Sequence, residues 1–234
     1  MQKLQTLNQS SFEKASQETQ NICQQAIDLM TSLQFSNEKK IKDIIDASYA
    51  TVPGSKMQAI KGQALVKTKI SECLSYDHDY NEITPDMPKD QRSGKTCRYL
   101  YFLNDDEKLN HQKMIKGEMI DGSQNICYQV LDAPSALVTR REFLFMRQTK
   151  DFSEGDKKKY AVASKSVEIN DKFADKVVRA QIFSLNIYEE VEGGVKVTAF
   201  YHVDPCGSIP SMLFNNMLDG QVGYIYDLNQ KIGK

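Results

Sequence analysis

Apolar runs separated by tight-turn signals constrain the fold of this sequence more than any other feature. In residues 114–203, three pairs of such runs each flank a short polar segment that contains glycine: Asp121-Gly122, Glu154-Gly155-Asp156 or Gly193-Gly194. The paired runs are Met114 to Ile120 with Ile126 to Leu131, Glu142 to Lys150 with Tyr160 to Ile169, and Val177 to Glu189 with Val195 to Val203. Short connections of this kind join antiparallel neighbours, so the sequence predicts one antiparallel meander.

The chain begins with a helix signal. Ser10 and Glu13 form a capping-box pattern, and apolar residues then recur at spacings of three and four as far as Leu33. We therefore predict one amphipathic helix from Ser11 to Leu33.

A further hairpin is predicted after this helix. The strand-like runs Ile41 to Val52 and Met57 to Lys67 flank Pro53-Gly54, whose residue types suit a type II turn. Lys67 to Leu74 has the pattern of a short helix. The signals from Tyr76 to Gln112 mix turn residues, charges and one apolar run, so no element is assigned there.

The C-terminal segment has the clearest helical pattern. Asp204-Pro205-Cys206-Gly207 has the residue types of a type I turn, which is expected to end the sheet. Pro210 can open a helix, and apolar residues recur at helical spacing from there to Ile232. We predict one long amphipathic helix, although Gly220 and Gly223 each cost about 1 kcal/mol relative to alanine in a helix interior.

These elements predict an α+β fold of the helix-grip type. A curved antiparallel sheet of about nine strands wraps on the long C-terminal helix, and a second helix stands at the N-terminus. A chain of 234 residues fits one domain of this kind. We expect residues 1–10 to form a tail and residues 11–234 to form the single domain.

Composition excludes several classes of protein. Thirty Lys and Arg against thirty-one Asp and Glu leave a net charge of −1, so no uniform field favours nucleic acid. No apolar stretch has the 18 residues of a membrane span, and Met1 to Ser10 lacks an apolar signal core, so a cytoplasmic location is expected. The five cysteines and three histidines are dispersed without ligand spacing, so we predict no metal and no cofactor.

Three segments of the second half resemble one family. Arg141-Glu142-Phe143-Leu144-Phe145-Met146-Arg147 is similar to an Arg-Asp-Phe-Val strand, and Val178-Arg179-Ala180 to a Val-Arg-Ala strand opening. His202 to Leu213 is similar to an Asp-x-x-Gly-x-Ile-Pro turn that leads into a lid helix. In this order the segments resemble the START domain, the steroidogenic acute regulatory protein-related lipid transfer family. The chain departs from the pattern in having Glu142 in place of Asp and no Trp.

The resemblance implies a non-catalytic protein that binds one lipid in a hydrophobic tunnel beneath the C-terminal helix and transfers it between membranes. It implies transient contact with a membrane surface. It also implies a lid made by that helix and by the loop from Leu131 to Thr139, in which Leu131, Pro134 and Leu137 are the expected lid residues. We expect a monomer, with a phospholipid or ceramide-like molecule as cargo rather than a sterol.

The predicted lipid-binding residues lie on the strands and on the lid helix: Gln129, Arg147, Phe143, Phe145, Tyr201, Leu213, Phe214 and Met217. An amide such as Gln129 both donates and accepts hydrogen bonds, and it stands where the family places a residue for the polar end of the lipid. Arg147 shares a strand face with Phe143 and Phe145, and a buried guanidinium needs a partner. Two other interpretations stay open: Gln129 as a solvent-facing or backbone-bonded amide, and Arg147 as a structural salt bridge.

Two other functions stay open from the sequence. An enzyme of the cyclase or hydrolase type can use the same helix-grip cavity, with His202 or His78 as acid or base. Period-two alternation places His202 on the strand face opposite Tyr201, so the orientation of His202 tests this hypothesis. The other alternative is a lipid-sensing module whose lid recruits a partner.

Overall fold

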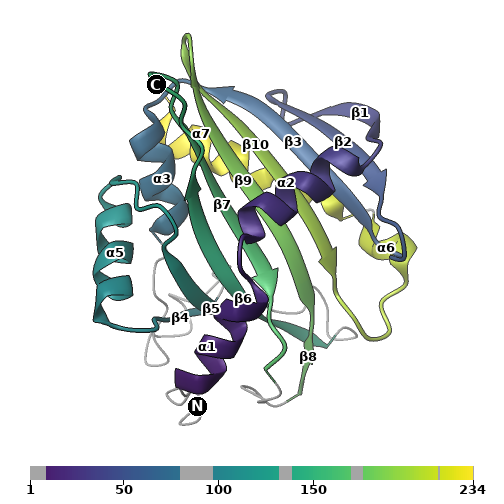
Figure 1. Cartoon of the computed structure of the whole chain (residues 1–234). Coiled ribbons are helices and arrows are strands. Elements are labelled where there is room, and N and C mark those ends of the chain that lie inside the picture. The colour runs from purple at the N-terminus through teal and green to yellow at the C-terminus, as the bar shows by residue number, and fades with distance from the viewer. Residues whose placement is uncertain (1–8, 80–96, 132–138, 170–175, 216, 234) are drawn as a thin grey trace, which may run out of the picture.

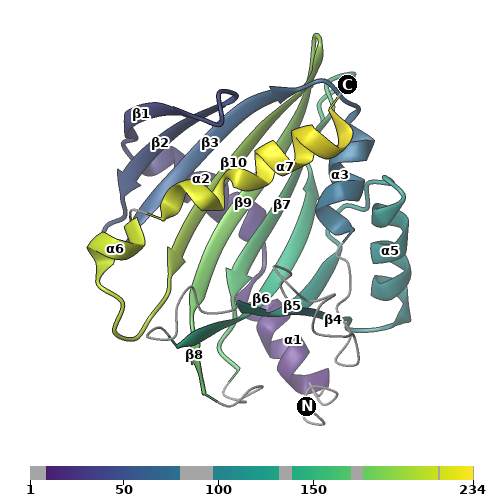
Figure 2. The ribbon, with the colours of Figure 1, turned by 180° about the vertical axis from the view of Figure 1, so that it is seen from behind.

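The computed structural model describes residues 9–79, 97–131, 139–169, 176–215 and 217–233. Within these residues, ten strands form one large sheet with helices on both faces (Figures 1 and 2). The strands are β1 (Ser36–Ile41), β2 (Ile45–Thr51), β3 (Gln58–Val66), β4 (Cys97–Tyr101), β5 (Gln124–Leu131), β6 (Arg140–Asp151), β7 (Lys159–Ser166), β8 (Val177–Arg179), β9 (Gln181–Val191) and β10 (Gly194–Asp204). The helices are α1 (Gln9–Glu18), α2 (Ile22–Ser32), α3 (Ile70–His78), α5 (Asp105–Ile115), α6 (Ser211–Asn215) and α7 (Gly223–Ile232), with a 3₁₀ turn η2 (Leu218–Gln221).

The strand order is β1-β2-β3-β10-β9-β7-β6-β5-β4, and β8 pairs with β6. After β3 the chain passes through α3 to the opposite edge of the sheet, and the strands from β4 onward return until β10 pairs with β3. The separately predicted hairpin β2–β3 is confirmed, and so are the hairpins β6–β7 and β9–β10 of the predicted meander. The helix-grip fold is also confirmed, because α7 lies across one face of this sheet (Figure 2).

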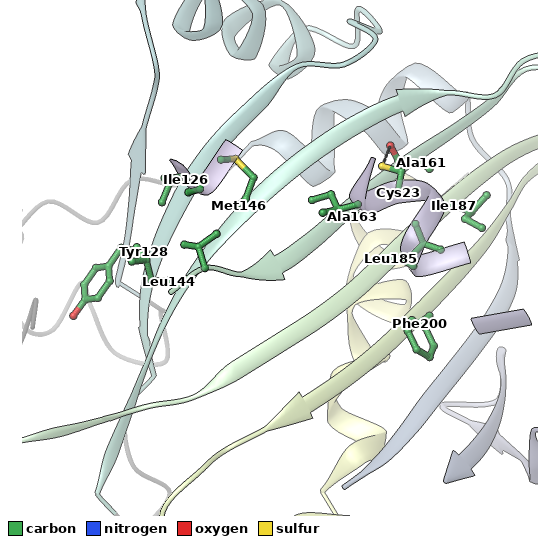
Figure 3. Close-up of a cluster of buried hydrophobic side chains, with 14 of the residues drawn as sticks. Cys23, Ile126, Tyr128, Leu144, Met146, Ala161, Ala163, Leu185, Ile187 and Phe200 are labelled. Carbon is green, nitrogen blue, oxygen red and sulfur yellow. Dashed lines mark hydrogen bonds between the residues drawn. The ribbon is translucent and has the colours of Figure 1, made fainter. Parts of the chain in front are cut away.

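The two faces of the sheet carry separate hydrophobic clusters. On the face covered by α1 and α2, here called the α2 face, Cys23 of α2 lies beside Ala161 in a cluster that also contains the strand residues Leu144, Leu185 and Phe200 (Figure 3). The opposite face is here called the α7 face, and there Leu218, Val222, Ile225 and Leu228 pack on the strands. Because side chains alternate along a strand, Phe143 and Phe145 of β6 lie on the α7 face while Leu144 lies on the α2 face.

The predicted N-terminal helix is interrupted. Asn21 takes a left-handed backbone conformation with φ of 58°, and the helix divides there into α1 and α2. Asparagine is one of the few residues that tolerates this conformation. The break lets Phe12 of α1 and Ile22 of α2 reach the same cluster on the sheet.

The predicted strand from Met114 to Ile120 is wrong, because α5 occupies its start. Asn104 caps this helix by accepting a hydrogen bond from the Glu107 N–H at 2.9 Å, and three acidic residues stand in the first turn. The cap lies in the segment to which the sequence assigned no element. Strand β1, at the edge of the sheet, was also not predicted.

The predicted strand from Val177 to Glu189 divides at Ala180, whose N–H donates to the Glu142 carbonyl at 2.9 Å. The short β8 before it runs parallel to β6, so the sheet is not wholly antiparallel. Arg179 of β8 forms an ion pair with the buried Glu142 of β6 at 2.8 Å, which helps to hold β8 against β6.

The segment after β10 differs from the prediction in two ways. Cys206 has φ of 51°, which excludes the type I turn predicted there. Arg141 instead fixes this turn, because its Nε and Nη2 donate to the carbonyls of Pro205 at 3.0 Å and Cys206 at 3.1 Å. The long C-terminal helix is interrupted as well, and it consists of α6, η2 and α7, with Gly223 as the first residue of α7.

The expected division into a tail over residues 1–10 and a domain over residues 11–234 stays a prediction. Residues 1–8 lie outside the described part of the chain, and α1 begins at Gln9.

The C-terminal segment approaches the sheet most closely at Gly62 of β3. A Cβ atom at this position would lie 2.9 Å from Cβ of Val222 and 3.0 Å from Cγ2 of Ile45. We expect Gly62→Ala to lower the free energy of unfolding by about 1–3 kcal/mol, because the packed backbone must move apart. Urea denaturation measures this change.

The matched control is Gly223→Ala, because a Cβ there has no atom within 4 Å. Alanine favours a helix over glycine by up to about 1 kcal/mol, so this variant should be neutral or more stable. Equal stability of Gly62→Ala and the wild-type protein would show that the close approach of Val222 to Gly62 does not limit the side chain at this position.

Candidate functional site

A row of polar side chains crosses the α7 face of the sheet. Residues paired across neighbouring strands stand side by side, and the pairing links one residue from each of five strands. The row runs through Asn125, Arg147, Ser164, Ser184 and Tyr201. The first four side chains are buried and Tyr201 is half-buried. Buried polar groups at this density need hydrogen-bonding partners.

Apolar clusters lie on both sides of the polar row. Toward the start of β6, Phe143 and Phe145 pack with Cys127 and Val203, and Phe214 of α6 contacts this group. Toward the other end of the strands, the residues of the α7 face contact Val222, Ile225 and Leu228. Along the strands, the α7 face therefore has an apolar region, then the polar row, then a second apolar region.

Arg147 of β6 forms a buried ion pair with Asp77 of α3. The two side chains are only 1% and 6% exposed, and Arg147 also donates to the Asp77 carbonyl at 2.8 Å. The Asp77 carboxylate accepts further hydrogen bonds from the Tyr188 hydroxyl and, at 3.2 Å, from the Asn186 amide. This arrangement balances the two buried charges.

The same network reaches the C-terminal helix. The hydroxyls of Tyr188 and Tyr224 lie 2.5 Å apart, and Tyr224 belongs to α7. Burial is the main cause that raises the pKa of both tyrosines well above the ordinary value of 10, so both hydroxyls keep their protons. Tyr201 adds a bond to the Asn186 side-chain oxygen at 3.3 Å. Hydrogen bonds thus connect α3, the sheet and α7.

Gln129 and the predicted aromatic residues lie on the α7 face. Gln129 is half-buried and pairs with Phe143 across β5 and β6. Phe143 and Phe145 belong to the apolar cluster, and Tyr201 ends the polar row.

The predicted lid residues fall into two groups. Phe214 is half-buried, whereas Met217 is 56% exposed and Leu131, at the end of β5, is 37% exposed. Pro134, Leu137 and the side chain of Leu213 lie outside the described residues. Their roles, like those of the other predicted lipid-binding residues, stay predictions.

Sequence reasoning missed Asp77, Asn186 and Tyr188, which complete the polar network. The predicted helix stopped at Leu74, three residues before Asp77. Asn186 and Tyr188 alternate with Leu185 and Ile187 in β9, and this period-two pattern was the available signal. That pattern places Asn186 and Tyr188 on the same face of β9, but it does not tell which face of the sheet holds Arg147.

The histidines occupy two separate regions. His202 lies in β10 on the α2 face, beside Phe200, and its Nε2 lies 3.0 Å from Oγ of Ser55. His78 is fully buried at the end of α3, with its ring centroid 5.6 Å from that of His111 in α5. His202 therefore lies on the opposite face of the sheet from the polar row.

Two general features of the described residues bear on function. Among them, no group of three or more His, Cys, Asp and Glu side chains is arranged to hold a metal ion. Nor does that part of the chain contain a helix whose length and apolar character would suffice to cross a bilayer.

The sequence matches the START domain family over residues 106–226, which is just over half of the chain. The chain therefore belongs to the START domain family. No curated protein matches the sequence. Domains of this family are in general lipid-binding modules without catalytic activity.

Solved structures support the fold. The chain is similar to "Human StAR-related lipid transfer protein 5" with a TM-score of 0.66 and 12% identity, over 94% of this chain and 97% of that chain. It is also similar to a STAR-related lipid transfer protein fragment from Xanthomonas axonopodis, with a TM-score of 0.61 and 18% identity over 84% and 97% of the two chains. The chain is similar as well to the human StarD13 (DLC2) lipid transfer and protein localization domain. Here the TM-score is 0.59 and the identity 18%, over 89% of this chain and 95% of that chain.

The Arg147–Asp77 pair should dominate the stability of this interior. Asp77→Ala leaves the guanidinium buried without its carboxylate, so we expect a loss of about 3–5 kcal/mol in the free energy of unfolding. The double variant Asp77→Leu with Arg147→Met removes both charges and should recover most of that loss. Urea denaturation of the single and double variants measures both effects.

Asp46→Ala is the matched control, since Asp46 pairs with Lys40 at the surface, where both side chains are more than half exposed. Its cost should stay below about 1 kcal/mol. A loss of similar size in Asp77→Ala and Asp46→Ala would contradict the central role of the buried pair.

The buried histidines should make stability depend on pH. Burial, with a smaller contribution from Arg147, lowers the pKa of His111 to about 4 and holds that of His78 well below 6.5. In the unfolded chain both take up protons near pH 6.5, so below that pH the unfolded state binds more protons than the folded state. The free energy of unfolding should therefore fall as the pH drops from 6.5 toward 4.

The variant His111→Phe tests how much one histidine contributes to the pH dependence of the free energy of unfolding. Each group contributes a slope of up to about 1.4 kcal/mol per pH unit in this window, so the variant should show a shallower slope than the wild-type protein. Denaturation at pH 7, 6, 5 and 4.5 gives both slopes. Parallel slopes would mean that His111 does not titrate differently on unfolding.

Proposed function

We propose that this protein binds one lipid between the α7 face of the sheet and the C-terminal segment and transfers it between membranes. The observation that carries the proposal is the polar row, buried on the α7 face between two apolar clusters, in a chain of the START family. A lipid has the same division into a polar group and apolar chains. The names of the solved relatives as lipid transfer proteins agree with this proposal.

The physical need for such a carrier follows from the hydrophobic effect. A sixteen-carbon acyl chain in water costs about 13 kcal/mol, at about 0.8 kcal/mol for each CH₂ group. An apolar interior removes this cost during transit between membranes. The same enclosure requires the C-terminal segment or the neighbouring loop to move when the lipid enters or leaves.

The exposed side chains near the breaks in the C-terminal segment support contact with a membrane. Met212 is 71% exposed in α6, and Met217 is 56% exposed just before η2. Large apolar side chains that face water can enter a lipid surface with a gain in free energy. We propose that these residues and Leu131 touch the bilayer transiently while α6 and η2 move.

The proposed cargo is a phospholipid or ceramide-like molecule, with Gln129 and Arg147 near its polar group. Phe143, Phe145, Tyr201, Leu213, Phe214 and Met217 are proposed to contact its apolar part. We also propose a monomer in the cytoplasm that binds neither nucleic acid nor a cofactor and has no catalytic activity. Among the described residues, Cys23, Cys73, Cys127 and Cys206 form no disulfide, which agrees with a reducing compartment.

The alternatives have less support. The enzyme hypothesis named His202 or His78 as the acid or base. His202 lies on the α2 face, which leaves only His78, buried beside the polar row, for that role. The sensing hypothesis shares the lipid site but needs no transfer. A transfer assay therefore separates the proposed carrier from a sensor.

The decisive experiment has two parts. Native mass spectrometry and lipid extraction of protein purified from its own cell type should show one lipid per chain. Transfer of fluorescent phosphatidylcholine or ceramide between vesicles should then be at least fivefold slower for Met217→Asp and Leu131→Asp, because a carboxylate at the contact opposes insertion into the bilayer. Gln129→Ala should reduce the amount of bound lipid.

Leu65→Asp is the matched control, since Leu65 is 52% exposed on β3 and alternates with Ala64 and Val66, so it lies on the face of the sheet opposite α7. It should transfer lipid at the wild-type rate. Wild-type protein that carries no lipid and transfers none would remove the proposed function. Bound lipid without transfer would favour the sensor.

A further inference from the structure

Three buried polar atoms close to Arg147 have no hydrogen-bonding partner in the described part of the chain. They are Nδ1 of His78, Nδ1 of His111 and Oδ1 of Asn125. The three side chains are 0%, 5% and 2% exposed. A buried polar atom without a partner costs about 1–3 kcal/mol, so three together indicate a missing partner.

These side chains lie at the α3–α5 end of the polar row, where the two histidine rings are neighbours and Asn125 stands beside Arg147. Asn125 begins the row as the cross-strand neighbour of Arg147. His78 follows Asp77, and its Nε2 lies 3.3 Å from Oγ1 of Thr149, two residues beyond Arg147 in β6. The ring centroids of His78 and His111 are 5.6 Å apart. We call His78, His111 and Asn125 the imidazole–amide cluster.

The charge of this region determines what it can bind. Burial lowers the pKa of both histidines, so both rings are neutral at pH 7. The charge of Arg147 is balanced by the Asp77 carboxylate. Oδ1 of Asn125 can only accept a hydrogen bond, and each free Nδ1 accepts one in the tautomer that carries its proton on Nε2. The three atoms can therefore all serve as acceptors, and the region has no net charge to balance an anion.

We propose that the imidazole–amide cluster accepts hydrogen bonds from a hydroxyl or amide N–H group of the bound lipid. The cluster would thereby favour an uncharged, donor-bearing lipid over an anionic one. A buried acceptor discriminates strongly against a ligand that lacks the matching donor, because the acceptor then stays unpaired. This inference rests on the proposed function and adds the chemical class of the polar group.

The test uses three lipids with identical acyl chains: diacylglycerol, its 3-O-methyl ether and phosphatidic acid. Each is offered in phosphatidylcholine vesicles to the full-length protein, and uptake is measured by native mass spectrometry in competition. The ether differs from diacylglycerol in lacking the hydroxyl donor. We expect the wild-type protein to prefer diacylglycerol over the ether by about tenfold, and over phosphatidic acid by at least as much.

The variants Asn125→Leu and His111→Phe remove one acceptor each with little change in volume. Each should lower the preference for diacylglycerol over the ether to less than about threefold. His202→Phe on the α2 face is the matched control and should keep the tenfold preference. Circular dichroism checks folding, and the second variant decides if the first fails to fold.

The outcomes separate the two proposals. Uptake of lipid without preference for the hydroxyl, or an unchanged preference in both variants, would overturn this inference and leave the proposed function in place. The second result would also mean that the cluster holds only internal water. Uptake of none of these lipids, and of no phosphatidylcholine from the vesicles, by the wild-type protein would remove both.

Discussion

The buried Arg147–Asp77 ion pair is the interaction on which the rest of the interior depends. Two charges removed from water cost several kcal/mol each unless their partners are close and fully bonded. Asp77 meets this requirement with Arg147, Asn186 and Tyr188, which come from two strands of the sheet. The hydroxyl of Tyr188 then meets Tyr224 of α7. Satisfying one buried charge therefore fixes α3, the sheet and the C-terminal helix relative to one another.

The α7 face combines this polar network with apolar clusters, and this combination suits an amphipathic ligand. A wholly apolar interior would accept acyl chains without regard to the polar group, whereas fixed polar side chains give selectivity. The unpaired atoms of His78, His111 and Asn125 lie at one end of the network. Because the ion pair leaves no net charge there, hydrogen bonding rather than charge determines the selectivity that we infer.

The C-terminal segment contains one part that is packed firmly on the sheet and one part that we propose moves when lipid is exchanged. Val222 packs so closely on β3 that Gly62 leaves no room for a side chain, so this part is held firmly to the sheet. Before it, α6 and η2 are short and interrupted, and Met212 and Met217 face outward. Short helical pieces have few internal hydrogen bonds, so they separate from the sheet at lower cost than one long helix. This division fits a lid that opens at one end.

The sequence by itself determined the elements that depend on local pattern. Period-two runs and tight turns predicted the hairpins, the order of strands and helices predicted the helix-grip fold, and three motifs predicted the family. The tertiary structure alone decided the breaks at Asn21 and before Gly223, the parallel pairing of β8 and the partner of Arg147. Arg147 could be named as a candidate because strand alternation is local. Asp77 could not, because a contact across 70 residues exists only after the sheet and α3 come together.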